Sequence, residues 1–148
     1  MSNPEKSQNP DHSREPFRYW QQVSTRWMDN DAYGHINNAV YYSYIDSVVN
    51  QFLIEHQLLD IEKSDSIGLV VQSQCRFFQP LSYPGQVDCG LRVTHLGNSS
   101  VRYEVGMFAE GEEAAAAVGG FTHVFVDREA RRPCPLSGVV RSALQGLV

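Results

Sequence analysis

The chain has 148 residues, of which 42% are hydrophobic and 20% charged, and its formal net charge is -5. This length allows one domain, and the composition is ordinary for a globular protein. The acidic balance argues against general binding to nucleic acid, because phosphate recognition needs clustered Lys and Arg. No apolar run approaches the ~20 residues that span a bilayer, and no signal-peptide pattern is present. We therefore expect a cytoplasmic protein that binds neither nucleic acid nor membrane.

The cysteines do not suggest a metal site or a disulfide framework. Cys75, Cys89 and Cys134 are scattered and odd in number, without a CxxC or Cys/His spacing. Free thiols in a reducing compartment are the simplest interpretation. We expect no metal and no cofactor.

The N-terminal half predicts a tail, a strand and a long helix. Residues 1–16 are polar with three prolines, which is typical of a disordered lead-in. Residues 17–28 alternate between apolar and polar side chains as a strand does, and residues 29–34 have the composition of a turn. From Asn38 to about His56 the polar residues form one narrow stripe at helical spacing, and the rest is apolar. Such a helix should be buried on most sides, as if a sheet were wrapped around it.

Four further segments predict strands. They are residues 67–79, 86–96, 101–109 and 114–126, separated by turn signals such as Gly97-Asn98. The alanines at 114–117 also suit a helix, whereas Gly119-Gly120 and the β-branched and aromatic residues after them favour a strand. A linker follows, and Ser137 could cap a short terminal helix.

The predicted fold class is α+β, with an antiparallel sheet of about five strands wrapped around one long central helix. The expected organisation is a disordered tail over 1–16, a domain over 17–128 and a C-terminal extension over 129–148.

The densest cluster of polar residues lies between the first strand and the helix, over residues 29–38. It is a poor calcium loop, because Tyr33 and Val40 occupy its fifth and twelfth positions, where that loop needs oxygen ligands. A metal site on His35 would lack a second ligand at useful spacing. Asn37 or Asn38 suits a helix cap, and Gly34 suits a backbone angle that bulkier residues avoid.

Asp31 is harder to explain by structure alone. A helix dipole stabilises a carboxylate before its first turn, but Asp31 stands several residues early for direct capping. Asp29 has the character of an ordinary turn residue. His35 could equally be a structural histidine or face a substrate. No GxSxG, GxxxxGK[ST] or GxGxxG pattern offers another chemistry.

The segment Asp29-Asn30-Asp31, followed by Gly34-His35-Ile36-Asn37-Asn38, resembles the DxDxxGHxNN signature of the 4-hydroxybenzoyl-CoA thioesterase group of hotdog proteins. The resemblance covers roughly residues 19–126. It implies a hotdog fold and the hydrolysis of a small or medium acyl thioester of coenzyme A or of an acyl-carrier protein. It also implies subunits that join sheets edge to edge as homodimers or homotetramers. The active sites would lie at the dimer interface.

By position in the motif, Asp31 is the catalytic carboxylate, as nucleophile or as general base on water. The resemblance places a backbone N–H near Asn38 on the thioester carbonyl, and it gives His35, Asn37 and Gly34 to substrate binding or to placing the water. Where that group would carry basic residues for coenzyme A, this chain has Leu96-Gly97-Asn98-Ser99-Ser100, so the aromatic acyl specificity does not carry over. The arginines left for phosphate contacts are Arg76, Arg92, Arg102, Arg128 and Arg131.

Two other functions suit the same residues. A hotdog hydratase or dehydratase would use Asp31 and His35 as an acid–base pair without cleaving the thioester. A non-catalytic acyl-CoA-binding module would bind the thioester without turnover.

Overall fold

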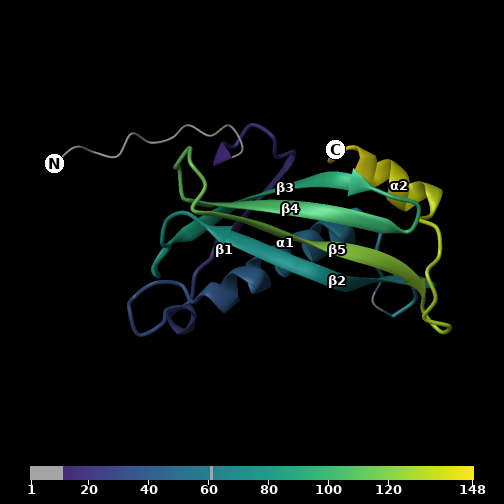
Figure 1. Cartoon of the computed structure of the whole chain (residues 1–148), viewed down its shortest axis with the longest axis horizontal. Helices are drawn as coiled ribbons and strands as arrows, with labels where there is room; N and C mark the ends of the chain where they lie inside the picture. Colours follow the sequence, from purple (N-terminus) through teal and green to yellow (C-terminus); the bar gives the residue numbers. More distant parts are fainter. Residues whose placement is uncertain (1–11, 61) are drawn as a thin grey trace.

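The computed structural model describes residues 12–60 and 62–148. Its five strands are β1 (Tyr19–Ser24), β2 (Ser66–Phe77), β3 (Gln86–Leu96), β4 (Ser100–Ala109) and β5 (Ala117–Asp127). They form one antiparallel sheet in the order β1-β3-β4-β5-β2, so β1 and β2 are its edges. Helix α1 (Asn38–Glu55) lies along one face of the sheet (Figure 1). The predicted strands and central helix are confirmed.

The core forms between α1 and the inner face of the sheet. Seven of the 18 helix residues are buried, namely Tyr41, Tyr44, Ile45, Val48, Val49, Phe52 and Leu53. The predicted polar stripe lies on the opposite side of the helix, where Asp46, Ser47 and Gln51 are exposed. The expectation that the helix is buried on most sides is wrong for the single chain, because the sheet covers only one side of it.

Two predicted boundaries shift for local reasons. β1 ends at Ser24 rather than Met28, because Trp27–Asp29 turns into a short 3-10 helix (η2). β5 begins at Ala117, so the alanine run leads into a strand and not into a helix. Gly119 is needed there, since a Cβ on it would lie 2.6 Å from the Gln74 carbonyl oxygen.

The segment before β1 lies on the outer face of the sheet. Phe17 packs there with Phe108, Ala115 and Val118, and Arg14 forms a 2.8 Å ion pair with Asp88. Residues 12–16 are therefore ordered, unlike the disordered tail expected over 1–16; the rest of that expectation lies outside the described residues.

The C-terminal segment completes the core. Helix α2 (Gly138–Gln145) opens on Ser137, whose Oγ accepts a hydrogen bond from the Val140 N–H. Leu144 and Leu147 are buried in the main core, beside β3. The expected extension over 129–148 is thus part of the domain. No helix in the described ranges is long and apolar enough to cross a membrane.

Candidate active site

The loop before α1 is anchored by a buried carboxylate, Asp29. Its Oδ2 accepts hydrogen bonds from the Tyr44 hydroxyl at 2.7 Å and from the Arg26 N–H at 2.9 Å. Its Oδ1 accepts from the Arg26 guanidinium at 3.0 Å, and its carbonyl accepts from the Asn37 N–H at 2.8 Å. The expectation of an ordinary turn residue is wrong: Asp29 joins η2 to the helix and positions the loop between them.

The hydrogen bonds keep Asp29 ionised. Burial alone would raise the pKa of its carboxyl, but the bonds from Tyr44 and Arg26 outweigh this and hold that pKa below its ordinary value. Burial, reinforced by the bond to Asp29, raises the pKa of Tyr44. Asp29 therefore serves as a fixed structural charge, because it takes up no proton near neutral pH.

The same loop is tied to the connection between β2 and β3. The Ile36 N–H donates to the Leu81 carbonyl at 2.7 Å, and the Tyr83 N–H donates to Asn30 Oδ1 at 3.0 Å. The Trp27 and Tyr83 rings meet edge to face, with centroids 6.0 Å apart. These contacts leave the loop little freedom at either end. In Figure 1 this loop lies at the left end of the sheet, where α1 begins, and α2 lies at the right end.

Asp31 lies inside this fixed loop, and only one of its two carboxylate oxygens is hydrogen-bonded within the described residues. Its Oδ1 accepts from the Tyr33 N–H at 2.8 Å and more weakly from the His35 N–H at 3.4 Å. Its Oδ2 has no hydrogen-bond partner in the described part of the chain. Gly34 turns the backbone with φ 79°, in the left-handed region expected for it. The loop therefore holds Asp31 by one oxygen and leaves the other available.

The start of α1 offers a donor next along the chain. Of the two asparagines expected to cap the helix, Asn37 is the one that does so. Its Oδ1 accepts a hydrogen bond from the Ala39 N–H at 2.9 Å, and its carbonyl accepts one from the Val40 N–H. Within residues 12–60 and 62–148 the Asn38 N–H meets no acceptor. An unpaired N–H at the positive end of a helix dipole suits a developing negative charge.

His35 stands beside Asp31 in sequence without pairing to it. Its side chain is exposed, and its imidazole has no hydrogen bond or ring contact in the described chain. Only its backbone N–H reaches the Asp31 carboxylate. An acid–base pair of the hydratase kind is therefore not formed within one chain.

The loop is open to solvent on its outer side. Tyr33 is 86% exposed and Trp27 76% exposed, although both are large and apolar for most of their surface. Gly34, Asn37 and Asn38 are exposed as well. A single chain thus provides the reactive loop without the enclosing wall that strengthens electrostatic interactions in an active site.

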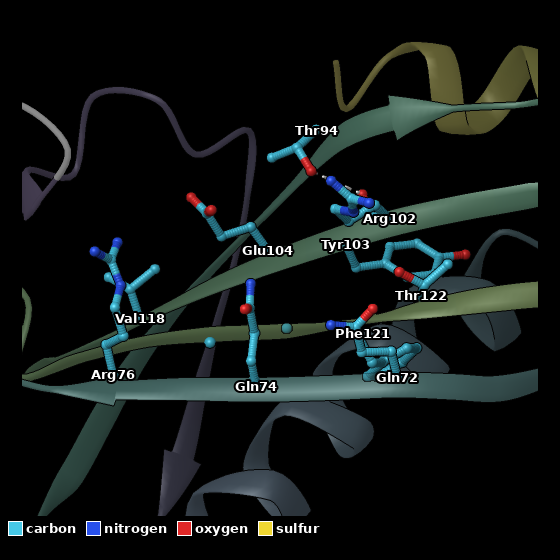
Figure 2. Close-up of a pocket in the computed structure, with 12 residues that line it drawn as sticks. Gln72, Gln74, Arg76, Thr94, Arg102, Tyr103, Glu104, Val118, Phe121 and Thr122 are labelled. Atoms are coloured by element: carbon cyan, nitrogen blue, oxygen red, sulfur yellow. Dashed lines mark hydrogen bonds between the residues drawn. The ribbon is translucent and has the colours of Figure 1, made fainter.

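The candidate arginines lie elsewhere. Arg92 binds Glu104 at 2.6 Å, and Arg128 donates to the Ser64 carbonyl. Arg76 and Arg102 line a hollow of about 170 Å³ whose residues Figure 2 draws. That hollow opens on the outer face, because Val118, which packs with Phe17 there, is one of its lining residues.

Two of the three cysteines are poor nucleophiles. Cys75, Cys89 and Cys134 are free thiols. Burial raises the pKa of Cys75 to about 11 and that of Cys89 to about 12, so neither forms a thiolate near neutral pH. Among the described residues no group of three or more His, Cys, Asp or Glu could hold a metal.

A family model that matches most of the chain identifies the family. The family model of the thioesterase-like superfamily matches residues 25–144. The chain belongs to this superfamily. It is a thioester hydrolase, as the resemblance implied. No curated protein sequence matches the chain.

Solved structures agree with the superfamily assignment. The PA5185 protein from Pseudomonas aeruginosa strain PAO1 is 48% identical, with 92% of this chain and 95% of that chain covered and a TM-score of 0.89. A thioesterase from Thermus thermophilus, solved with coenzyme A and zinc, is 30% identical over 90% and 96% of the two chains, with a TM-score of 0.72. The gentisyl-coenzyme A thioesterase BH1999 shares the fold at 23% identity, with a TM-score of 0.75 and coverage of 85% and 99%. The predicted hotdog fold is confirmed.

Proposed function

We propose that this superfamily member hydrolyses acyl-CoA thioesters with Asp31 as the catalytic carboxylate. The proposal rests on two groups of the same fixed loop that have no hydrogen-bond partner in the described chain. They are one carboxylate oxygen of Asp31 and the N–H of Asn38, where α1 begins. The coenzyme A in the Thermus thermophilus structure favours coenzyme A over a carrier protein as the thiol.

The helix start would polarise the thioester. The Asn38 N–H donates to the carbonyl oxygen, and the helix dipole stabilises the negative charge that forms there. Removing one such donor typically costs ~3 kcal/mol of barrier. Because the donor is backbone, the side chain of Asn38 can change without loss of this contact.

Asp31 would supply the second half of the reaction. As a general base it takes a proton from a water whose oxygen bonds to the carbonyl carbon; as a nucleophile its own oxygen does so, and water later opens the anhydride. In both routes the carbon–sulfur bond breaks and the thiolate gains a proton. Gly34, His35 and Asn37 would shape the loop around the substrate, with Asn37 acting through its cap.

A second subunit would close the site. In the described chain β2 pairs with β5 on one side only, and apolar side chains are exposed along it, including Leu69, Val70, Val71 and Phe77. A long, apolar, unpaired edge is a template for another strand. We therefore propose a homodimer that joins two β2 strands; pairing of dimers into a homotetramer is the further step that the family resemblance implies.

The test is release of free thiol from short, medium, branched and aromatic acyl-CoAs. Wild type should release thiol from at least one of them, and Asp31→Ala should lower kcat at least ~100-fold, as for loss of a required base or nucleophile. Consumption of enoyl-CoA without new thiol would indicate a hydratase, and saturable binding without turnover would indicate a binding module. Either result would contradict the proposal.

A further inference from the structure

A hollow of about 210 Å³ lies at the end of α1 away from the catalytic loop. It opens between the last turns of α1 and the beginning of β2, with β5 beneath it. Its walls are mainly apolar and include Leu53, Leu58, Leu59, Ile67 and Phe125; its polar residues are Asn50, Ser66 and His123. A cavity of ~150 Å³ holds a benzene ring, so this one has room for a small apolar group.

His123 is the unusual residue in this wall. It is 4% exposed, and its Nδ1 has no hydrogen-bond partner among the described residues. Its ring is surrounded by Tyr103, Phe121 and Phe125, at centroid distances of 5.4, 4.5 and 6.0 Å. Buried polar atoms are nearly always hydrogen-bonded, so an unpaired one indicates a missing partner.

Gly68 makes room for the His123 imidazole. A Cβ on Gly68 would lie 2.6 Å from His123 Nδ1, which is closer than real atoms approach. Gly68 and His123 both line the hollow. The imidazole can therefore occupy this wall only because residue 68 has no side chain.

The proposed dimer brings this hollow to the catalytic loop of the other subunit. The Phe77 end of β2 lies near the start of α1, since the Phe77 and Tyr41 rings are 5.0 Å apart. The Ser66 end of β2 lines the hollow. When two β2 strands pair antiparallel about a two-fold axis perpendicular to the sheet, both α1 helices stay on the same face, and the Ser66 end of one strand meets the Phe77 end of the other.

We propose that His123 is a specificity-determining residue, and that its hollow receives the far end of the acyl group held at Asp31 of the opposite subunit. The acyl group that fits is small and mainly apolar, with a hydroxyl at its far end. This inference rests on the proposed thioesterase function and on the β2 dimer.

A hydroxyl is favoured over other polar groups by the chemistry of the wall. Burial lowers the pKa of His123 to about 4, so its imidazole is neutral near pH 7, with one donor and one acceptor nitrogen. A hydroxyl both donates and accepts, so it pairs with either tautomer. A carboxylate or ammonium would be buried without a countercharge, because no Asp, Glu, Lys or Arg of the described ranges lines the hollow.

The first test compares hexanoyl-CoA with its ω-hydroxyl derivative in the thiol-release assay. Wild type should favour the hydroxylated substrate in kcat/KM, and His123→Phe, which keeps an aromatic ring, should reduce that preference at least ~10-fold. His95→Phe, at an exposed histidine of β3, is the matched control and should retain the preference. Should His123→Phe fail to fold, Gly68→Ala serves as the second variant, because its methyl group displaces the imidazole.

The second test asks which subunit supplies His123. Asp31→Asn and His123→Phe chains are co-expressed with different affinity tags, and the mixed dimers are isolated. If the hollow serves the opposite subunit, one site of each mixed dimer keeps both residues, so the hydroxyl preference returns to the wild-type value. If the hollow serves its own subunit, the site that keeps Asp31 lacks the histidine, and the preference stays that of His123→Phe.

The outcomes separate the two proposals. If thiol release depends on Asp31 while the preference for the hydroxylated substrate is unchanged in His123→Phe and Gly68→Ala, this inference is overturned and the proposed function stands. Mixed dimers with the preference of His123→Phe would overturn the placement across subunits. Absence of Asp31-dependent thiol release would overturn both.

Discussion

The two ends of α1 treat buried polar groups in opposite ways. At the first end, both oxygens of Asp29 are bonded, and Asn37 caps the helix. At the other end, His123 Nδ1 lies in an apolar wall with no partner in the described chain. The first arrangement fixes a geometry, and the second leaves a hydrogen-bonding position for another molecule. The difference indicates where rigidity serves the reaction and where the protein can recognise a substrate.

The largest effect is expected from breaking the proposed dimer, which would bring the His123 hollow of one subunit to the Asp31 loop of the other. Val71→Lys places a charge on the free edge of β2, where Val71 is 61% exposed, and should convert the dimer to a monomer. Because the site would lose its second wall, kcat/KM should fall at least ~100-fold. Light scattering gives the mass and thiol release gives the rate. Val139→Lys, at a 71% exposed valine of α2, is the matched control and should leave both unchanged; equal masses for the two variants would contradict the β2 dimer.

Because His123 is buried, the free energy of unfolding should fall in mild acid. The pKa of His123 is about 4 in the folded chain against 6.5 for a free histidine, so the unfolded chain binds the proton first as pH falls. Stability is therefore fully present above pH 6.5 and is lost as pH falls towards 4, by about 3 kcal/mol in all. Urea unfolding across this range should show the loss in wild type and a smaller one in His123→Phe. Parallel curves for the two proteins would contradict a buried neutral His123.

The stability of the loop before α1 should depend on Asp29. Asp29→Ala leaves the Tyr44 hydroxyl and the Arg26 N–H without their acceptor, and should lower the free energy of unfolding by about 2–3 kcal/mol. The loop would loosen with it, so kcat should fall although Asp29 touches no reacting atom. Urea unfolding measures the first effect. Asp46→Ala, at an exposed aspartate of α1, should cost far less; a similar cost at both positions would argue against the anchoring role.

A smaller change at the same end isolates one hydrogen bond. Tyr44→Phe keeps the ring in the core and removes only the hydroxyl that donates to Asp29 at 2.7 Å. We expect a loss of about 1 kcal/mol in urea unfolding, the usual net value of one such bond. It should also raise the pKa of Asp29, whose carboxyl resonance can be followed by NMR titration. An unchanged titration would show that Arg26 alone holds the carboxylate.

Local patterns predicted most of the fold. The alternation in β3 and the start of α1 at Asn38 are in the sequence itself, because each depends on neighbouring residues. The Asn37 cap and the Gly34 turn are local for the same reason. The resemblance to the DxDxxGHxNN signature added the role proposed for Asp31, which no periodicity could supply.

What the sequence did not predict depends on contacts between distant segments. Asp29 is buried only because Tyr44, 15 residues later, returns to it; a buried tyrosine needs an acceptor, and that requirement was the available signal. The packing of Phe17 on the outer face likewise needs Gly106, far along the chain, to leave room for its ring. The unpaired nitrogen of His123 appears only once β2 and β5 are placed side by side.

The most direct test of the catalytic role is kcat for thiol release by Asp31→Asn. Asparagine keeps the oxygen that accepts the Tyr33 N–H, so the loop should hold its shape while the carboxylate is lost. With Asp46→Asn as control, we predict a fall of at least ~100-fold for Asp31→Asn and none for the control. An Asp31→Asn enzyme with the wild-type kcat would contradict the account.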